Sequence, residues 1–546
     1  MDLETDRLSI LTDLIVAYNS PVSIQFCFAK DFAYMNLAGR VAEVQEENDT
    51  SNRLFRIEIK FQATETERAI IQSCICELAP LEPGLLTPSR GTERNPDPRT
   101  ILSLFVTDNP YLLHYRRKGS VERSWSTILE HPQGNGHNGH QKDRRVNGKV
   151  PRFTPRWSWK LIPKAFLVVL QMLRDWLILA LPRSIGHMLA PTITFAFIAH
   201  PRDLNDVARK VPIAHFLPSH LVNLWLRHQR PVVGSYVTGL KKENGQLATG
   251  VMVFSPLTTE QMIKNPKLAR KRIHQATRLA ENMGAQIVGL GAFTSILTKD
   301  GYDLIGKVGV GITTGNAFSA AIAVQNAVLA AYQTNLSLPH AIVAVVGGAG
   351  SVGSACAKLM APVSAGLILV DIKKNDLKKT IQYFQNRSIS VESTPCVEVV
   401  KKADIIIVAT NSPHTVITAE HLKSGAIVID AAQPKNVSVT VPRERPDVLV
   451  IESAVVKTPN INCNFDLGVG PDEALGCLSE TMLLTAIGWN GHYSLGKASP
   501  EQAAEMIAAS QSLGFRLAYF RNSQGYISEQ QLAHVARARL TTTAHV

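Results

Sequence analysis

Short apolar runs alternate with stretches of helical spacing along the carboxyl-terminal two-thirds of the chain. The apolar runs are rich in valine and isoleucine, as buried strands are. Predicted strands cover residues 192–198, 285–290, 341–346, 367–370, 403–411 and 426–430. Residues 268–283 have the spacing of an amphipathic helix, and residues 317–332 predict a long alanine-rich one. This alternation predicts an α/β fold with a parallel sheet.

One segment, His340 to Asp376, predicts a Rossmann dinucleotide-binding unit. It consists of a strand, a glycine loop, a helix, a second strand and an acid. The glycines of such a unit allow a tight turn, close approach of a pyrophosphate and close helix packing, and the acid binds a ribose hydroxyl. The candidate cofactor-binding residues are Gly347, Gly348, Gly350, Ser351, Val352, Gly353, Asp371 and Lys373. The alternative is a glycine-rich turn that binds nothing.

Polar side chains end two further predicted strands. Thr410 and Asn411 end one strand, and Asp430 ends the next. A dinucleotide binds at the carboxyl edge of such a sheet, so these residues are candidates for cofactor contacts. The alternative is that they are ordinary turn residues.

A smaller α/β domain is predicted over residues 192–335. Asn244-Gly245, between apolar residues 234–240 and 247–254, is a strong β-hairpin signal. The last helix of this domain leads directly into the dinucleotide unit. A cleft between two such domains is the expected place for a substrate.

The first 115 residues predict a small, mainly β accessory domain. Pro21–Phe28 and Leu54–Phe61 have strand character, and Thr64–Cys76 has helical character. This order, with the segment FRIEIKFQATETERAIIQ, resembles a PilZ domain, a small β-barrel that binds cyclic di-GMP. No Arg-x-x-x-Arg precedes the predicted strands as an entry to the barrel, and residues 1–115 lack the Asp/Asn-x-Ser-x-x-Gly motif of that domain. We therefore expect a degenerate, PilZ-like barrel without a nucleotide ligand.

The positive charge of the chain is concentrated in one segment. The 546 residues carry a formal net charge of +12, and residues 116–164 hold 12 lysines or arginines against 3 acids. Residues 116–160 are polar and lack apolar periodicity, which predicts a disordered linker. Because the basicity is local, we expect no nucleic-acid partner.

Residues 161–191 contain an apolar helix. Its apolar run is broken by Gln171 and by the pair Arg174–Asp175, which makes spanning a bilayer costly. Three of the six tryptophans lie nearby, at 157, 159 and 176. Residues 116–182 therefore predict contact with an anionic membrane surface. The alternative is a helix packed on the next domain.

The cysteines indicate a reducing environment. They are seven in number and scattered, and the first residues are acidic rather than basic and apolar. We expect free thiols in a cytoplasmic protein with peripheral membrane contact. Cys74 and Cys76 lack a partner pair, and the histidines at 131, 137 and 140 lie in a polar tract, so no metal site is expected.

Six short motifs follow one another in the second part of the chain. They are LGAFTSIL (290–297), TTGN (313–316), the glycine loop, IDAAQPKN (429–436), GCLSETMLL (476–484) and GW (488–489). Together they resemble the long-chain acyl-[acyl-carrier-protein] reductases over about residues 195–515. The resemblance implies that a nicotinamide reduces a fatty acyl thioester of acyl carrier protein or coenzyme A to the aldehyde. It also implies a cysteine that holds the acyl group, matched by Cys477, and substrate-side residues at Phe293, Thr294, Ser295, Thr314 and Asn316.

The sequence near Cys477 bears on thiol reactivity. Residues 471–473 resemble a first helical turn, so Cys477 is expected in the early turns, where the helix dipole lowers a thiol pKa modestly. Glu480 shares that helix face and would raise the thiol pKa, so we expect a structural or proton-handling role in the catalytic site. Cys463 is the alternative nucleophile. The backbone near Gly291 or Gly315 is the candidate oxyanion donor.

The cofactor signals disagree. The resemblance implies NADPH, whereas Asp371 favours NADH because an acid binds the 2′-hydroxyl and repels a 2′-phosphate. Lys373 and Lys374 follow at once and offer charge for a phosphate. We expect NADPH, with NADH as the alternative.

The sequence therefore predicts an NAD(P)H-dependent acyl-thioester reductase. Its expected parts are an accessory domain (1–115), a linker (116–160), an apolar helix (161–191), a substrate domain (192–335), a Rossmann domain (336–458) and a carboxyl-terminal helical segment with Cys477 (459–546). Two alternatives stay open. One is an amino-acid or hydroxy-acid dehydrogenase without a covalent intermediate, and the other is a non-catalytic nucleotide-sensing membrane adaptor.

Overall fold

The structure, a computed structural model, forms two compact units, residues 1–142 and residues 143–546. The structure describes residues 2–3, 7–12, 21–27, 34–48, 53–61, 161–189, 191–211, 214, 216–412, 414–470 and 472–543. The predicted helix at 64–76 and the predicted linker at 116–160 lie outside these residues.

Five antiparallel strands are described in the first unit, in the order β1-β2-β5-β4-β3. They are β1 (Asp2–Leu3), β2 (Arg7–Thr12), β3 (Pro21–Cys27), β4 (Tyr34–Asn48) and β5 (Arg53–Phe61). Strands β3 and β5 coincide with the two runs that the sequence predicts. A β-bulge between Val41 and Glu43 interrupts the β4–β5 pairing. The PilZ-like reading of this unit stays a prediction.

The first half of the second unit is a five-stranded sheet in the order β10-β9-β6-β8-β7. Its strands are β6 (Phe195–Ala199), β7 (Val232–Lys241), β8 (Leu247–Phe254), β9 (Ile287–Leu290) and β10 (Gly311–Thr313). All neighbours are parallel except β7 and β8. The predicted hairpin is confirmed, since the β7–β8 turn has Gly245 at φ +82°. The first strand begins at Phe195, three residues later than predicted.

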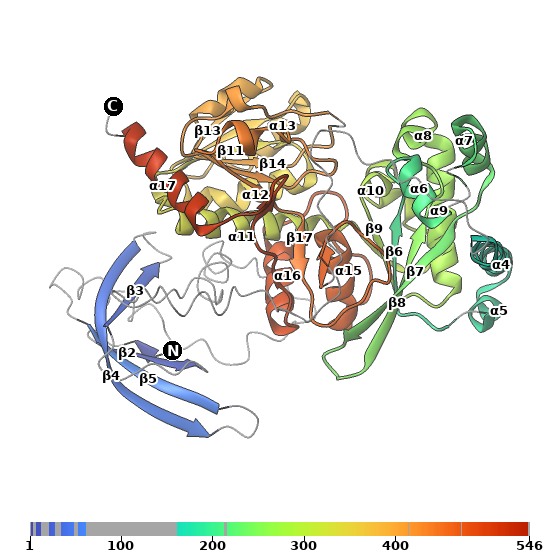
Figure 1. Ribbon diagram of the computed structural model, residues 1–546, viewed down its shortest axis with the longest axis horizontal. Coiled ribbons are helices and arrows are strands. Elements are labelled where there is room, and N and C mark those ends of the chain that lie inside the picture. Colours follow the sequence, from blue (N-terminus) through green and yellow to red (C-terminus); the bar gives the residue numbers. More distant parts are fainter. Residues whose placement is uncertain are drawn as a thin grey trace. The chain divides into compact units, whose positions relative to one another are not determined.

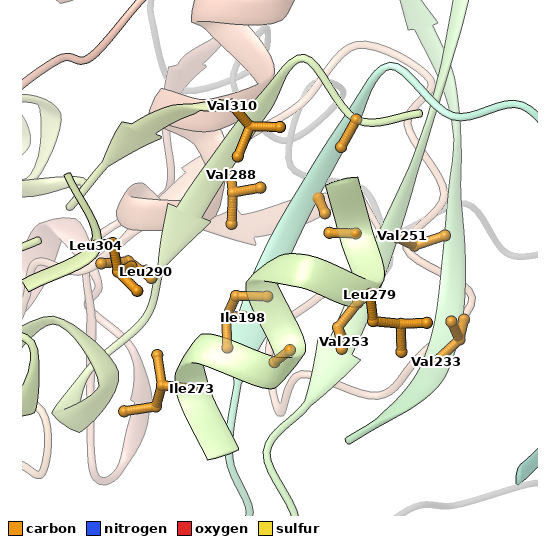
Figure 2. Close-up of a cluster of buried hydrophobic side chains, with 14 of the residues drawn as sticks. Ile198, Val233, Val251, Val253, Ile273, Leu279, Val288, Leu290, Leu304 and Val310 are labelled. Carbon is orange, nitrogen blue, oxygen red and sulfur yellow. The ribbon is translucent and has the colours of Figure 1, made fainter. Parts of the chain in front are cut away.

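Helices cover this sheet and lead to the second one. They are α4 (Leu161–Ala180), α5 (Arg183–Gly186), α6 (Leu204–Lys210), α7 (Ser219–His228), α8 (Thr259–Lys264), α9 (Pro266–Asn282), α10 (Phe293–Leu297) and α11 (Asn316–Gln333). Ile198, Val251 and Val288 of the sheet pack with Ile273 and Leu279 of α9 in one buried cluster (Figure 2). Burying such side chains contributes about 1.5–3 kcal/mol each, which is why these apolar runs form the interior.

The second half is a Rossmann domain, as the sequence predicts. Its strands are β11 (Ile342–Val346), β12 (Gly366–Val370), β13 (Ser390–Thr394), β14 (Ile405–Val408), β15 (Ile427–Asp430) and β16 (Leu449–Glu452). All pairs are parallel and the order is β13-β12-β11-β14-β15-β16. This is the 3-2-1-4-5-6 arrangement of dinucleotide-binding folds. Its helices are α12 (Ser351–Met360), α13 (Lys374–Gln382) and α14 (Val441–Glu444).

The chain then returns to the region between the two sheets. The elements are β17 (Val455–Lys457), β18 (Glu473–Leu475), α15 (Gly476–Ala486), α16 (Pro500–Ser512), β19 (Arg516–Leu517), β20 (Arg521–Asn522), β21 (Gly525–Tyr526) and α17 (Glu529–Thr543). Figure 1 shows α15 and α16 between the two halves, and both pack against α11. The α/β fold class is thus confirmed, and α15 joins the substrate side to the Rossmann side.

Candidate active site

The glycine loop after β11 is packed so closely that two of its positions exclude a side chain. Gly347 has φ +87°, and a Cβ there would lie 2.5 Å from the carbonyl oxygen of Ala409. A Cβ on Gly353, in the first turn of α12, would lie 2.2 Å from the carbonyl oxygen of Gly347. The loop therefore stays open to a pyrophosphate while α12 begins directly behind it. These residues fit a dinucleotide.

Asp371 is attached to the same loop. Its Oδ2 accepts a hydrogen bond from the Ala349 backbone N–H (3.0 Å), and its Oδ1 accepts one from the Lys373 backbone N–H (2.9 Å). One oxygen therefore stabilises the glycine loop and the other the turn after β12, so the acid has a structural reason to be present besides a ribose hydroxyl. The side chains of Lys373 and Lys374 are exposed beside it.

Ser351, at the start of α12, binds a short segment that we call the strap, residues 494–498. The Ser351 hydroxyl donates to the carbonyl of Gly496 (2.6 Å) and accepts from the Ala498 N–H (3.0 Å). On the other side, the Thr314 hydroxyl donates to the carbonyl of Ser494 (2.6 Å). The strap thus connects the predicted cofactor side with the predicted substrate side.

The polar residues at the other strand ends have internal roles. The Thr410 hydroxyl donates to Oδ1 of Asn436 (2.6 Å), while Asn411 is exposed. The buried carboxylate of Asp430 accepts the backbone N–H groups of Ala432, Asn436 and Val437. Asp430 was a candidate for cofactor contact, but its hydrogen bonds show that it shapes the following loop. Burial raises the pKa of Asp430, opposed by the charge of Lys435 and by these N–H groups.

Cys477 is the second residue of α15. The prediction that a helix begins at residues 471–473 is wrong, because Glu473–Leu475 forms strand β18 paired with β17. The helix begins at Gly476, so the thiol lies in its first turn. A Cβ on Gly315 would lie 2.3 Å from both Cα and Cβ of Cys477, so the TTGN loop packs directly on the cysteine. The two motifs, far apart in sequence, therefore form one site.

The thiol of Cys477 is held in its neutral form. Burial raises its pKa to about 12, the charge of Glu480 raises it further, and the Leu478 backbone N–H opposes the shift. The residue itself is half-buried rather than fully enclosed. A nucleophilic thiolate therefore requires that a proton be removed as the substrate binds.

Glu480 organises the wall of this site. Its side chain is fully buried, and Oε1 accepts from the Ser494 hydroxyl (2.6 Å), the Gly315 N–H (3.1 Å) and the hydroxyl of Thr313. Oε2 accepts from the Phe318 N–H (2.7 Å). Burial raises the pKa of Glu480, and these donors oppose the shift. Two of these four donors, Thr313 and Gly315, belong to the TTGN loop, and the other two join it to α11 and to the strap. This use of both carboxylate oxygens favours the structural alternative for Glu480 over proton handling.

The expected oxyanion donors are already in use. The Gly315 N–H donates to Glu480, and the Gly291 N–H donates to the carbonyl of Ile198 (3.0 Å). The N–H groups of these two glycines thus have internal partners, and an oxyanion donor elsewhere in the backbone near Gly291 or Gly315 stays a prediction. The side-chain amide of Asn316 is half-buried beside Gly315, and Nδ2 is 3.5 Å from the Gly496 carbonyl, the limit of a hydrogen bond.

The remaining substrate-side residues form the wall after β9. Thr294 is fully buried and its hydroxyl donates to the Gly291 carbonyl (2.7 Å), while the Ser295 hydroxyl donates to Asp300 (3.2 Å). Ala292 turns the chain with φ +47°. Phe293 is buried, and its ring meets the ring of His200 edge-on at 6.1 Å between centroids.

His200 is a site residue that the sequence analysis missed. It follows β6, at the same carboxyl edge as Gly291 after β9 and Thr314 after β10. Its Nδ1 lies 3.1 Å from the Pro201 carbonyl, so Nδ1 carries the proton and Nε2 is an acceptor. Nε2 is buried and has no hydrogen-bond partner in the described part of the chain. Burial lowers the pKa of His200. Thr410 became a candidate because it is a polar residue at the end of a predicted strand, and the same criterion applied to β6 would have identified His200.

No group of three or more potential metal-ligating side chains occurs among the described residues.

Residues 329–452 match the family model described as shikimate/quinate 5-dehydrogenase. The chain is 28% identical over 320 residues to the long-chain acyl-[acyl-carrier-protein] reductase of Synechococcus elongatus, covering 56% of this chain and 92% of that protein. It is also 26% identical over 320 residues to aminotransferase PigE of a Serratia strain, covering 56% of this chain but only 37% of that relative.

Among solved structures, L-tryptophan dehydrogenase from Nostoc punctiforme is similar at 12% identity and a TM-score of 0.28. The match covers 64% of this chain and 89% of that one. So distant a structural likeness adds nothing about substrate. The Rossmann fold, the match to a dehydrogenase family model and the similarity to a reductase together indicate a nicotinamide-dependent oxidoreductase in general terms.

Replacing Gly353 by alanine should weaken dinucleotide binding by about tenfold or more, because the added Cβ pushes α12 away from the loop. Fluorescence titration with NADPH and NADH measures this. Gly366→Ala is the matched control, since its Cβ would meet only an ordinary contact, 3.5 Å from the Ser390 carbonyl. Equal affinity in the two variants would contradict the assignment of the loop.

Alkylation of Cys477 should accelerate about tenfold per pH unit between about pH 7 and pH 10, because its pKa is raised to about 12 and the thiolate fraction rises throughout that range. Iodoacetamide labelling followed by peptide mass mapping gives the rate at this residue. Cys477→Ser provides the blank for its peptide. A plateau near neutral pH would show that the free protein already holds a thiolate.

Proposed function

We propose that this protein is an NADPH-dependent reductase that converts long-chain acyl thioesters of acyl carrier protein or coenzyme A into fatty aldehydes. The observation that carries the proposal is the half-buried Cys477 in the first turn of α15, packed on Gly315, whose N–H donates to Glu480. The similarity to a long-chain acyl-[acyl-carrier-protein] reductase, over 92% of that protein, supports the choice of substrate.

In the proposed first step, the sulfur of Cys477 attacks the thioester carbonyl carbon. A carbon–sulfur bond forms to the cysteine, the bond to the carrier sulfur breaks, and the thiol proton ends on the leaving carrier thiol. A reduced nicotinamide held at the glycine loop would supply a hydride to the carbonyl carbon of the enzyme-bound thioester. In the second step the carbon–sulfur bond to Cys477 breaks, the aldehyde leaves, and the Cys477 thiolate takes up a proton from solvent.

The residues around the thiol have separate proposed roles. His200 is the candidate proton acceptor, because neutral imidazole presents Nε2 without a partner at the carboxyl edge of the sheet. The Asn316 amide is the candidate donor to the carbonyl oxygen. Glu480 positions the loop that carries Asn316 and does not itself touch substrate.

The proposed preference for NADPH rests on charge. Both carboxylate oxygens of Asp371 accept loop N–H groups, so the acid is accounted for without a ribose contact. Lys373 and Lys374 present exposed cationic side chains at the same turn, where a 2′-phosphate would lie.

Incubation of the full chain with palmitoyl-CoA should add the mass of one palmitoyl group, and Cys477→Ala should abolish both this adduct and aldehyde formation with NADPH. Intact-protein mass spectrometry and gas chromatography of the aldehyde measure the two effects. Cys463→Ala is the control and should retain both, since the neighbouring Asn462 pairs with Thr238 of the edge strand β7 rather than with the TTGN loop. Turnover by Cys477→Ala would favour a dehydrogenase without a covalent step, and tight cofactor binding without any turnover would favour a nucleotide sensor. A preference for NADH by a hundredfold would overturn the choice of cofactor.

His200→Gln should lower kcat by about 10²–10⁴-fold with little change in the KM for palmitoyl-CoA, because general-base assistance acts in the transition state. Added imidazole should restore part of the rate. His228→Gln, an exposed histidine at the end of α7, is the control. A rate within about twofold of wild type would remove His200 from the mechanism.

A further inference from the structure

Helix α4 turns its polar side chains toward the protein. The Gln171 amide donates to the Val233 carbonyl (2.9 Å), and Asp175 accepts from the Val233 N–H (2.7 Å). The carboxylate of Asp175 is fully buried and pairs with Arg174 at 2.7 Å. The charged pair that interrupts the apolar run therefore serves to fix α4 on the edge strand β7.

The same side of α4 is also held by apolar packing. Ile178 lies in the buried cluster of the first sheet, and the Asn282 amide caps the end of the helix by donating to the carbonyls of Ile178 (2.9 Å) and Leu181 (3.1 Å). The orientation of the helix on this domain is thus fixed by contacts from both β7 and α9.

The outward side of α4 is apolar. Phe166, Val169, Leu170, Leu173 and Leu177 follow one another at helical spacing, and each is between 46% and 62% exposed. Ile185, Met188 and Leu189 continue the exposed apolar surface beyond the helix. We call these eight side chains the α4 face. A helix on a water-exposed surface normally has the reverse arrangement, with polar residues outward.

The α4 face lies apart from the candidate active site. Figure 1 shows α4 and α5 at the outer side of their domain, beyond β7, whereas α15 lies on the opposite side. No helix among the described residues has the length and apolarity needed to cross a bilayer. An apolar face that is fixed on a folded domain and does not span a bilayer fits the surface of one.

The charge around the α4 face distinguishes between two possible partners, a second copy of the chain and an anionic lipid surface. Residues 144–189 contain nine lysines and arginines and a single acid, Asp175, which is buried against Arg174. Two copies of this region facing one another would bring like charges together, whereas anionic lipid headgroups would neutralise them. We propose that the α4 face lies on the surface of an anionic lipid bilayer. This inference is independent of the proposed activity.

Sedimentation of the full chain with vesicles tests the inference. The wild-type protein should sediment with vesicles containing phosphatidylglycerol, more weakly with phosphatidylcholine alone, and less as salt is raised. Leu173→Gln with Leu177→Gln should lower the apparent affinity about tenfold or more. Val439→Gln with Leu540→Gln, two exposed apolar residues elsewhere, is the matched control and should bind as wild type.

Dinucleotide titration shows that each variant is folded, and light scattering reports its oligomeric state. Wild-type protein that stays in the supernatant with anionic vesicles would overturn the inference. If the Leu173/Leu177 variant is then monomeric where the wild type is a dimer, a second copy covers the face. Equal vesicle binding by wild type and the Leu173/Leu177 variant would also overturn it, because the contact would lie elsewhere.

Discussion

The candidate site depends on one buried carboxylate. The carboxylate of Glu480 accepts hydrogen bonds from residues between the end of β10 and the start of α11 and from Ser494 of the strap, so two segments distant in sequence are held by one side chain. A buried charge is costly unless it is fully hydrogen-bonded, and here the bonds serve to position rather than to react. The same network holds Gly315 against Cys477, which lies one helical turn before Glu480.

Much of the fold follows from the sequence because its signals are local. Parallel strands buried on both faces must be continuous apolar runs, and the loop from Gly347 to Gly353 tolerates no side chain at its closest contacts. The hairpin at Asn244-Gly245 is likewise set by a residue that accepts a positive φ. The start of α15 was misplaced because Glu473–Leu475 forms a strand only through its pairing with β17. That partner cannot be inferred from the segment itself.

The site was less predictable, since its decisive features are contacts between distant residues. The sequence indicated Cys477 and the TTGN motif separately, but only the fold brings Gly315 against the cysteine. The position of His200 directly after a strand could have marked it as a candidate, but only the fold shows that its Nε2 is buried and without a partner in the described part of the chain. The helix α4 shows the same limit. The sequence shows that the pair Arg174–Asp175 makes spanning a bilayer costly, but only the fold shows that Asp175 binds β7 while the apolar side faces outward.

The strap is bound by hydrogen bonds to both halves of the candidate site. Ser494 and Gly496 each accept a hydroxyl, one from the loop beside the thiol and one from the start of α12, and Lys497 Nζ donates to Thr380 of α13 (3.2 Å). Any widening of the space between the halves therefore stretches the same five residues. If the protein has the proposed activity, one short length of backbone therefore contacts both the nucleotide side and the side of the acyl group.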